Sequence, residues 1–204
     1  LSPEARYNAS KAEFQRLAAL APGNAERMAG LEGAGRTFLE ASGAYNAHLL
    51  RPGLALVKGW QRMQGFVHRI DDGRFAGRRA ADAIKAALAD EKCLMVNRNA
   101  GAGTRVLIDK LLGGARPPGY SNQPRSHNAV AATVAQGRAD WGIAIAPVAR
   151  LYGLGFLPIA PEDYDFLLVE RRRDRPAVRA FLAALHDGAT REKIRALGMR
   201  PADA

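Results

Sequence analysis

The residues with the clearest potential for chemistry lie in a glycine-containing loop within residues 96–114, which read VNRNAGAGTRVLIDKLLGG. Gly101 and Gly103 let the backbone adopt positive φ angles and approach a ligand closely, because they carry no Cβ. An apolar helical segment follows, and its first N–H groups and its dipole favour an anion. Thr104 adds a hydroxyl donor and Arg105 a forked guanidinium donor. The loop therefore indicates either an anion site or an ordinary strand-to-helix turn with Arg105 in solvent.

A second polar helix start follows at residues 126–128, which read SHN. Ser126 can cap the helix, and the His127 imidazole and the free N–H groups of the first turn add further polar groups at the same place. His127 by itself is more often a surface or capping residue than a ligand contact. Two polar helix starts in one α/β unit nevertheless favour an anion site. Asp140, just before an apolar run, either orients a donor or ends a turn, and we favour the turn.

The glycine loop fits neither of the common nucleotide-binding motifs. A Walker loop needs Lys and then Ser or Thr after its last glycine, whereas Thr104 and Arg105 follow Gly103 here. The dinucleotide motif lacks its third glycine, because Val106 stands in that place. We therefore expect no bound dinucleotide.

The common catalytic and metal-binding motifs are also missing, including Gly-x-Ser-x-Gly and His-Glu-x-x-His. The 4 histidines lack the spacing of metal ligands. Cys93, the only cysteine, has apolar neighbours, which predicts a buried thiol and no catalytic role. Asp163 and Asp165 fall in a predicted turn and strand start, where we expect exposure. The sequence predicts a protein that is not an enzyme and that uses no metal or cofactor.

The composition describes a basic globular chain. Its 204 residues are 48% hydrophobic, enough for one substantial core or two small lobes. A net charge of +10 favours an anionic partner without identifying it, and the arginines near residues 171–179 are interpreted as a solvated surface, so nucleic acid is not expected for this chain alone. No stretch reaches the ~18 apolar residues of a membrane span, so we expect a soluble chain. The first residue is not Met, which is consistent with a further upstream segment and leaves the localisation open.

Short apolar runs alternate with helical stretches after residue 54, whereas residues 1–42 show helical patterns only. Such alternation predicts an α/β sheet, largely parallel, with ligands at the carboxyl ends of strands where helices begin. We predict strands at residues 54–57, 65–67, 93–96, 141–146, 156–159 and 164–169, and helices at residues 79–88, 104–112, 127–136, from 147, 176–186 and 190–197.

Four runs of the sequence together resemble a known family: VNRNAGAGTRVLIDKLL, SHNAVAATVAQGRADWGIAI, LGFLPIAPEDYDFLLVE and PAVRAFLAAL. They are similar to the type 2 periplasmic-binding-protein-like (PBP-like) domains that are described as molybdate-binding or LysR substrate-binding-like. The resemblance covers about residues 43–200 and includes GAYN at 43–46 and RMQGFV at 62–67. Members occur as free solute-binding proteins, behind a helix-turn-helix in regulators, and fused to molybdopterin-biosynthesis proteins.

The resemblance implies two α/β lobes that are joined by two crossing strands and hold a ligand between them. It places the crossings near residues 64–69 and 164–170, so that residues 70–161 form lobe II, and residues 1–69 with 162–204 form lobe I. Family members begin with a strand, a helix and a second strand, which residues 1–42 do not show, so we expect either that the N-terminal lobe is reduced or that this chain lacks part of the usual sequence. The implied ligand-binding residues are Asn99, Gly101, Gly103, Thr104, Arg105, Ser126, His127 and Gln64.

The resemblance and the anion-binding helix starts agree on a function. We expect a binding domain that closes on a small oxyanion such as molybdate or tungstate, for a transporter permease or a fused regulatory domain. The alternative is the ligand-sensing domain of a transcriptional regulator or of a molybdopterin-biosynthesis fusion, which would bind an organic metabolite. An enzyme of pterin or cofactor metabolism is a third hypothesis, and the chain could also form a homodimer. A free solute-binding protein would be periplasmic and a regulator or biosynthetic fusion cytoplasmic.

Overall fold

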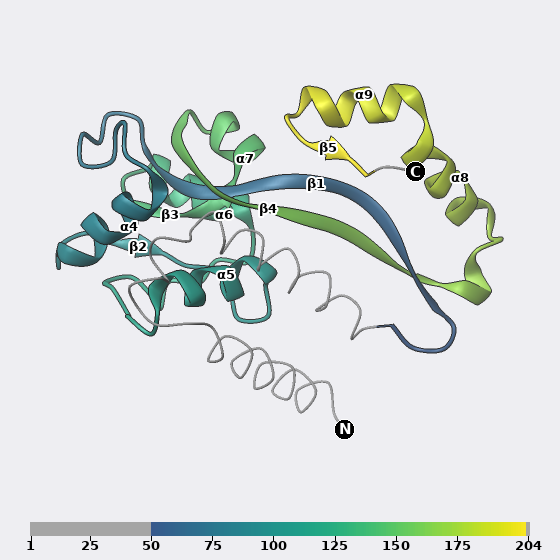
Figure 1. The fold of residues 1–204 in the computed structure, drawn as a ribbon, viewed down its shortest axis with the longest axis horizontal. Coiled ribbons are helices and arrows are strands. Elements are labelled where there is room, and N and C mark those ends of the chain that lie inside the picture. Colours follow the sequence, from purple (N-terminus) through teal and green to yellow (C-terminus); the bar gives the residue numbers. More distant parts are fainter. Residues whose placement is uncertain (1–49, 203–204) are drawn as a thin grey trace.

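The computed structural model describes residues 50–202, so the helices that the sequence predicts over residues 1–42 lie outside the described part. A single mixed sheet organises the described residues (Figure 1). Its strands are β1 (Leu54–Arg69), β2 (Met95–Val96), β3 (Trp141–Ile145), β4 (Leu154–Val169) and β5 (Arg200–Pro201). Their order is β2-β3-β1-β4, and β5 pairs with β1.

Most strand pairs in this sheet are antiparallel. β1 runs antiparallel to β3, β4 and β5, and only β2 and β3 are parallel among the described strands. The prediction of a largely parallel sheet is therefore wrong. The reason is that β1 and β4 are each 16 residues long and pair with each other over their whole length, which makes one antiparallel pair the largest part of the sheet.

Each of the two long strands replaces two shorter predicted ones. Residues 54–57 and 65–67 both belong to β1, and residues 156–159 and 164–169 both belong to β4. In the sequence, the polar residues between these segments indicated the end of one strand and the start of another. In the structure they pair across the two strands, as with Gln61 and Asp163 at 3.1 Å, and this pairing lets the strands continue.

The helices agree with the prediction to within about two residues. They are α4 (Ala80–Ala89), α5 (Gly103–Leu112), α6 (His127–Ala135), α7 (Ala146–Leu151), α8 (Pro176–His186) and α9 (Gly188–Ala196), with a 3-10 turn at Glu170–Arg172. Ser126 caps α6 as expected, since its Oγ accepts a hydrogen bond from the Ala129 N–H at 3.1 Å. Gly137 follows that helix with φ +67°, which confirms the predicted stop.

Two apolar cores lie on opposite faces of the sheet. Phe66 belongs to the core that contains Leu107 and Ile108 of α5, whereas its neighbour Val67 belongs to the core that contains Val130 of α6. This alternation follows from the two-residue period of a strand. Figure 1 shows α4 to α7 gathered around one end of the β1–β4 pair, with α8 and α9 toward the other end.

The sequence-based expectations about the thiol and the membrane can be compared with this fold. Cys93 is fully buried, as predicted, and burial raises the pKa of its thiol to about 12, so the thiol is protonated at neutral pH. Within residues 50–202, no helix combines the length and the apolar character that crossing a membrane requires.

Candidate functional site

The loop after β2 and the segment before α6 lie side by side. The Asn97 N–H donates to the Asn122 carbonyl at 2.8 Å, and the Asn99 N–H donates to the Pro124 carbonyl at 3.3 Å. The Asn97 side chain adds a bond from Nδ2 to the Tyr120 carbonyl at 3.0 Å. These bonds bring together the starts of α5 and α6, the two polar helix starts of the sequence.

The start of α5 has the features of an anion-binding helix end. Gly101 has φ +85°, which a residue with a Cβ rarely adopts. Ala102 occupies the N-cap position and supplies no side-chain hydrogen bond, in contrast to Ser126 of α6. The N–H groups of the first turn, which include those of Gly103 and the buried Thr104, are therefore not capped by a described side chain.

Arg105 holds the loop in place through hydrogen bonds of its guanidinium group. Its Nε donates to Asp109 Oδ1 at 2.8 Å, its Nη1 to the Arg98 carbonyl at 2.9 Å, and its Nη2 to the Tyr120 hydroxyl at 2.6 Å. Its side chain is only 12% exposed, so the alternative that placed Arg105 in solvent is wrong. Burial alone would lower the pKa of Arg105, but the interactions with Asp109 outweigh it and raise that pKa. The guanidinium holds the loop in shape and is not free to meet a ligand with all its nitrogens.

Arg98 is the buried cation of the site, and the sequence-based prediction missed it. The residue is 8% exposed. Its Nη2 donates to the Arg125 carbonyl at 3.3 Å and its Nη1 lies 3.2 Å from each ring nitrogen of His127, whereas Nε has no hydrogen-bond partner among the described residues. Burial lowers the pKa of this guanidinium, and the nearby Glu162 partly offsets the effect. The sequence feature that could have identified Arg98 is its position two residues after the buried strand residue Val96, where a side chain does not reach solvent easily.

His127 supports Arg98 as a neutral ring. Burial, followed by the charges of Arg98 and Arg62, lowers the pKa of His127 to about 3. The imidazole is therefore uncharged at neutral pH, and one of its ring nitrogens can accept a hydrogen bond from Arg98.

Gln64 adds a further buried polar side chain from β1. It precedes Phe66 by two residues, and therefore faces the α5 side of the sheet. The residue is fully buried, and neither its Nε2 nor its Oε1 has a partner within the described chain. Asn99 Oδ1 is also buried without a partner there. Such groups are rare in proteins because each costs about 1–3 kcal/mol, and they commonly mark a place where a ligand or water binds.

Glu162 brings a carboxylate to the start of α5. It lies opposite Arg62 in the β1–β4 register, and its Oε2 accepts a hydrogen bond from Arg62 Nε at 2.5 Å. A Cβ placed on Gly103 would lie 3.4 Å from the other oxygen, Oε1. Neither charged residue was predicted, because both fall in stretches of the sequence that read as breaks between strands.

We group these residues as the Arg98 cluster, because Arg98 lies against His127, the charges of Glu162 and Arg62 act on Arg98, and Gln64 lies two residues from Arg62 on the same face of β1. Its charges are two guanidinium cations and one carboxylate, so it keeps an excess positive charge for an anion. Within residues 50–202, no group of His, Cys, Asp or Glu side chains could hold a metal ion. The cluster consists of Arg62, Gln64, Arg98, Asn99, Gly103, His127 and Glu162.

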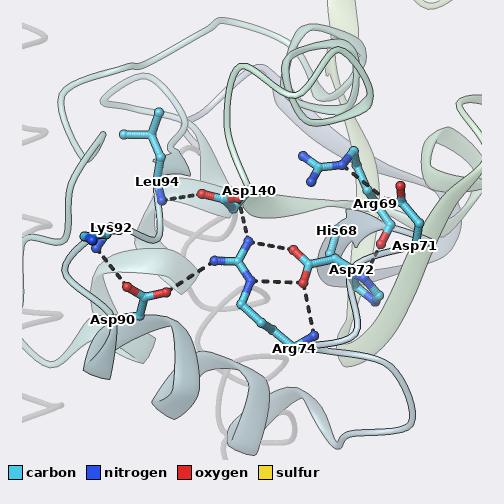
Figure 2. A network of polar contacts seen from close by, with 9 residues as sticks. All are labelled: His68, Arg69, Asp71, Asp72, Arg74, Asp90, Lys92, Leu94 and Asp140. Carbon is cyan, nitrogen blue, oxygen red and sulfur yellow. Dashed lines mark hydrogen bonds and ion pairs between the residues drawn. The ribbon is translucent and has the colours of Figure 1, made fainter.

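A second polar group, the Arg74 cluster, lies near the carboxyl end of α4 (Figure 2). The Arg74 guanidinium donates to Asp72 at 2.7 and 3.0 Å, to Asp140 at 2.6 Å and to Asp90 at 3.3 Å. Asp140 also accepts a hydrogen bond from the Leu94 N–H at 2.7 Å. The expectation that Asp140 merely ends a turn is wrong, because this carboxylate joins two donors from different segments.

A small cavity is lined by residues of β1 and β4 and by the segment at residues 200–202. Its volume is about 210 Å³, and it contains Asp163 and Asp165, which were expected to be exposed. The Asp165 side chain is only 3% exposed, so that expectation is wrong for Asp165. The other lining residues are Lys58, Trp60, Gln61, Arg200, Pro201 and Ala202.

The chain is similar in sequence to one described family and to one curated protein. A family model described as PBP superfamily domain matches residues 17–186. The uncharacterized protein YvgK of Bacillus subtilis (strain 168) is 35% identical over 82 residues, which cover 38% of this chain and 27% of YvgK. The match therefore spans less than a third of the length of that relative.

Two solved structures share the fold at low sequence identity. PEB3 with L-phospholactate bound has a TM-score of 0.52 and 14% identity, over 81% of this chain and 77% of PEB3. A two-component system protein that mediates signal transduction has a TM-score of 0.54 and 15% identity, over 71% of this chain and 55% of that protein. These likenesses confirm the α/β fold of the type 2 periplasmic-binding class that the sequence predicted.

Proposed function

The chain belongs to the PBP superfamily, and we propose that it is a binding domain for a small oxyanion, with molybdate and tungstate among the candidate ligands. Domains with this fold typically bind small solutes and do not catalyse reactions. One observation supports the proposal above the others. Arg98 Nε and both amide atoms of Gln64 are buried without partners among the described residues, and the start of α5, which follows Arg98 in the chain, has no side-chain cap.

A bound oxyanion would satisfy the donors among these groups together. Its unprotonated oxygens accept hydrogen bonds from the Arg98 guanidinium, from Gln64 Nε2 and from the N–H groups of Gly103 and Thr104, whereas Gln64 Oε1 needs a hydroxyl or a water as its donor. Charge-assisted hydrogen bonds in a site removed from water are stronger than those at the surface. The energy lost by burying unpartnered polar groups in the free protein is thereby recovered on binding.

The remaining predicted residues have supporting roles in the proposal. Gly101 shapes the loop, and Asn99 offers its Oδ1 as an acceptor for a ligand hydroxyl or a water, since its Nδ2 already donates to the Ala100 carbonyl. Arg105 and Ser126 hold the loop and the start of α6 in position, since their side chains already have partners. His127 orients Arg98. We further propose that residues 70–161 form one lobe, that residues 1–69 with 162–204 form the other, and that the two close around the ligand.

The purpose of binding is also part of the proposal. PEB3 shows that this fold can hold L-phospholactate, which carries a phosphate group, although the likeness to this chain is one of fold. We propose that the bound anion is either delivered to a transporter permease or reported to a fused regulatory domain. The +10 net charge of the chain supports an anionic ligand in both settings.

A thermal-unfolding screen tests the proposal with molybdate, tungstate, sulfate, phosphate and a pterin. A ligand at about 100 times its Kd should stabilise the protein by about 2.7 kcal/mol, which raises the melting temperature measurably. Arg98→Ala should reduce this stabilisation to about a third at the same ligand concentration, whereas Arg138→Ala, which removes an exposed arginine of the same charge, should preserve it. If no oxyanion raises the melting temperature at millimolar concentration, the proposal is wrong, and a shift with the pterin alone would support the metabolite-sensing alternative.

A further inference from the structure

The Arg98 cluster contains a carboxylate at the place where an anion would bind. Glu162 Oε1 lies near the first turn of α5, since a Cβ on Gly103 would be 3.4 Å away. Glu162 is 9% exposed, so the carboxylate is largely removed from water. A site designed only to attract anions gains nothing from a buried carboxylate at this position, because like charges repel.

The ion pair with Arg62 uses only one of the two oxygens of the Glu162 carboxylate. Arg62 Nε donates to Oε2, and no described group donates a hydrogen bond to Oε1. The Arg62 guanidinium also lies over the Tyr164 ring at 4.6 Å, a second contact that holds it in place. One acceptor oxygen is therefore presented to the site in a fixed place.

An ionised carboxylate can only accept hydrogen bonds. Sulfate, molybdate and tungstate carry no proton at neutral pH, so their oxygens would face Glu162 Oε1 as acceptor against acceptor. Inorganic phosphate and arsenate keep at least one hydroxyl proton at neutral pH, and that hydroxyl can donate to Glu162 while the other oxygens accept from Arg98 and the α5 N–H groups. We propose that Glu162 makes the site select oxyanions that carry a hydroxyl proton over fully deprotonated ones. This inference rests on the proposed function and narrows its ligand class.

The arrangement of charges is compatible with such selection. Arg62 and Arg98 both act on this site, as their joint effect on the pKa of His127 indicates. Two cations against one carboxylate leave a net attraction for an anion, and Glu162 then discriminates between anions of similar size and charge. Selectivity of this type arises from a repulsive element that acts on the wrong ligand.

Calorimetric titration of the whole chain at neutral pH tests the inference with phosphate, arsenate, sulfate and molybdate. We expect the wild-type protein to bind phosphate and arsenate about tenfold or more tightly than sulfate and molybdate, as expected for one charge-assisted hydrogen bond gained or lost. Glu162→Gln should reduce this ratio to about 1–3, mainly because sulfate and molybdate bind more tightly to a side chain that can donate.

Asp163→Asn is the matched control. It removes one negative charge from the next residue of β4, whose side chain lies on the opposite face of the sheet and accepts from Gln61 at 3.1 Å. The control should keep the wild-type ratio of affinities.

The outcomes separate this inference from the function on which it rests. Oxyanion binding with sulfate or molybdate at least as tight as phosphate overturns the inference and leaves the function intact. An unchanged ratio in Glu162→Gln has the same meaning. If none of the four anions binds, both are overturned. Should Glu162→Gln fail to fold, the wild-type ratio of phosphate to sulfate affinity still decides.

Discussion

Two arginines with opposite surroundings organise the polar interior of this protein. Each of the three nitrogen atoms of Arg74 donates to a carboxylate, and the hydrogen bond to Asp72 raises the pKa of Arg74. Arg98 is more deeply buried, yet it has no carboxylate within hydrogen-bond distance among the described residues, and burial lowers its pKa. The charge of Arg74 is fully compensated by carboxylates of the protein, whereas the charge of Arg98 is compensated only in part.

The difference indicates two different roles. A fully satisfied network fixes segments in one arrangement, here the turn after β1, the end of α4 and the start of β3. A partly satisfied one lowers the stability of the free protein and is retained where a ligand completes it. We therefore assign stability to the Arg74 cluster and binding to the Arg98 cluster, and the predictions below test that division.

The largest expected effect is on the Arg74 side. Arg74→Ala should lower the free energy of unfolding by about 3 kcal/mol, because the buried Asp72 carboxylate loses its cation. The value is at the low end for a buried ion pair, since the Arg74 side chain is 40% exposed. Urea unfolding measures the loss. Oxyanion affinity at a temperature where the variant is folded should stay within about twofold of wild type, and a larger drop would contradict the division of roles.

The second effect is on the Arg98 side and should appear in binding. Arg98→Ala should weaken oxyanion binding by about 30-fold, close to 2 kcal/mol, because a charge-assisted hydrogen bond is lost. The free energy of unfolding should change by less than about 1 kcal/mol, since the buried guanidinium was only partly compensated in the free protein. Titration calorimetry and urea unfolding of the same preparation measure both quantities. A variant that is destabilised as strongly as Arg74→Ala would show that Arg98 is structural.

The sequence predicted well the part of the candidate site that the starts of α5 and α6 form. Glycine spacing and capping residues are local signals, so the starts of α5 and α6 were placed correctly, with the positive φ at Gly101 and the cap at Ser126. Gln64, which the resemblance also named, lies in the long strand β1 and is fully buried. Its role, like that of the other predicted ligand residues, stays a prediction.

The part of the site that β1 and β4 contribute depends on contacts between residues far apart in the chain, which no local sequence pattern reveals. Arg62 and Glu162 are 100 residues apart in the chain, and only the β1–β4 register brings them together. Each stands in a polar stretch that resembles a turn when it is considered alone. The same misreading divided each long strand into two and predicted parallel pairing, because a strand with polar cross-strand pairs lacks an apolar run to identify it.

The two clusters should also lose stability in different ranges of pH. The pKa of His127 is lowered to about 3 from 6.5, so its contribution to stability is complete above 6.5 and is lost as the pH falls toward 3. The pKa of Asp72 is lowered from 3.8 by its hydrogen bond with Arg74, so its contribution is complete above 3.8 and is lost only below it. In both cases the unfolded chain binds more protons, which makes stability rise with pH.

Differences between variants isolate these contributions. Between pH values of about 6.5 and 5, the wild-type protein should lose about 1.5 kcal/mol more stability than His127→Gln. Asp72→Asn should match the wild-type slope in that range and deviate from it only in more acidic solution. Equal slopes for wild type and His127→Gln would indicate that His127 titrates normally, and would remove the support that a buried neutral ring gives to Arg98.

The smallest expected effect tests the division most directly, because it has the opposite sign from the usual one. Gln64→Met replaces a buried amide that has no described partner with an apolar chain of similar shape, and should raise the free energy of unfolding by about 0.5–1 kcal/mol. The same change should weaken oxyanion binding by about fivefold, because the ligand loses one hydrogen bond. Gln61→Met on the same strand is the matched control, since its amide donates to Asp163 and faces away from the cluster. That variant should lose about 0.5–1 kcal/mol and keep its affinity. If Gln64→Met is instead the less stable of the two, Gln64 has a structural partner in the folded protein, and the unsatisfied amide no longer distinguishes the binding cluster from the structural one.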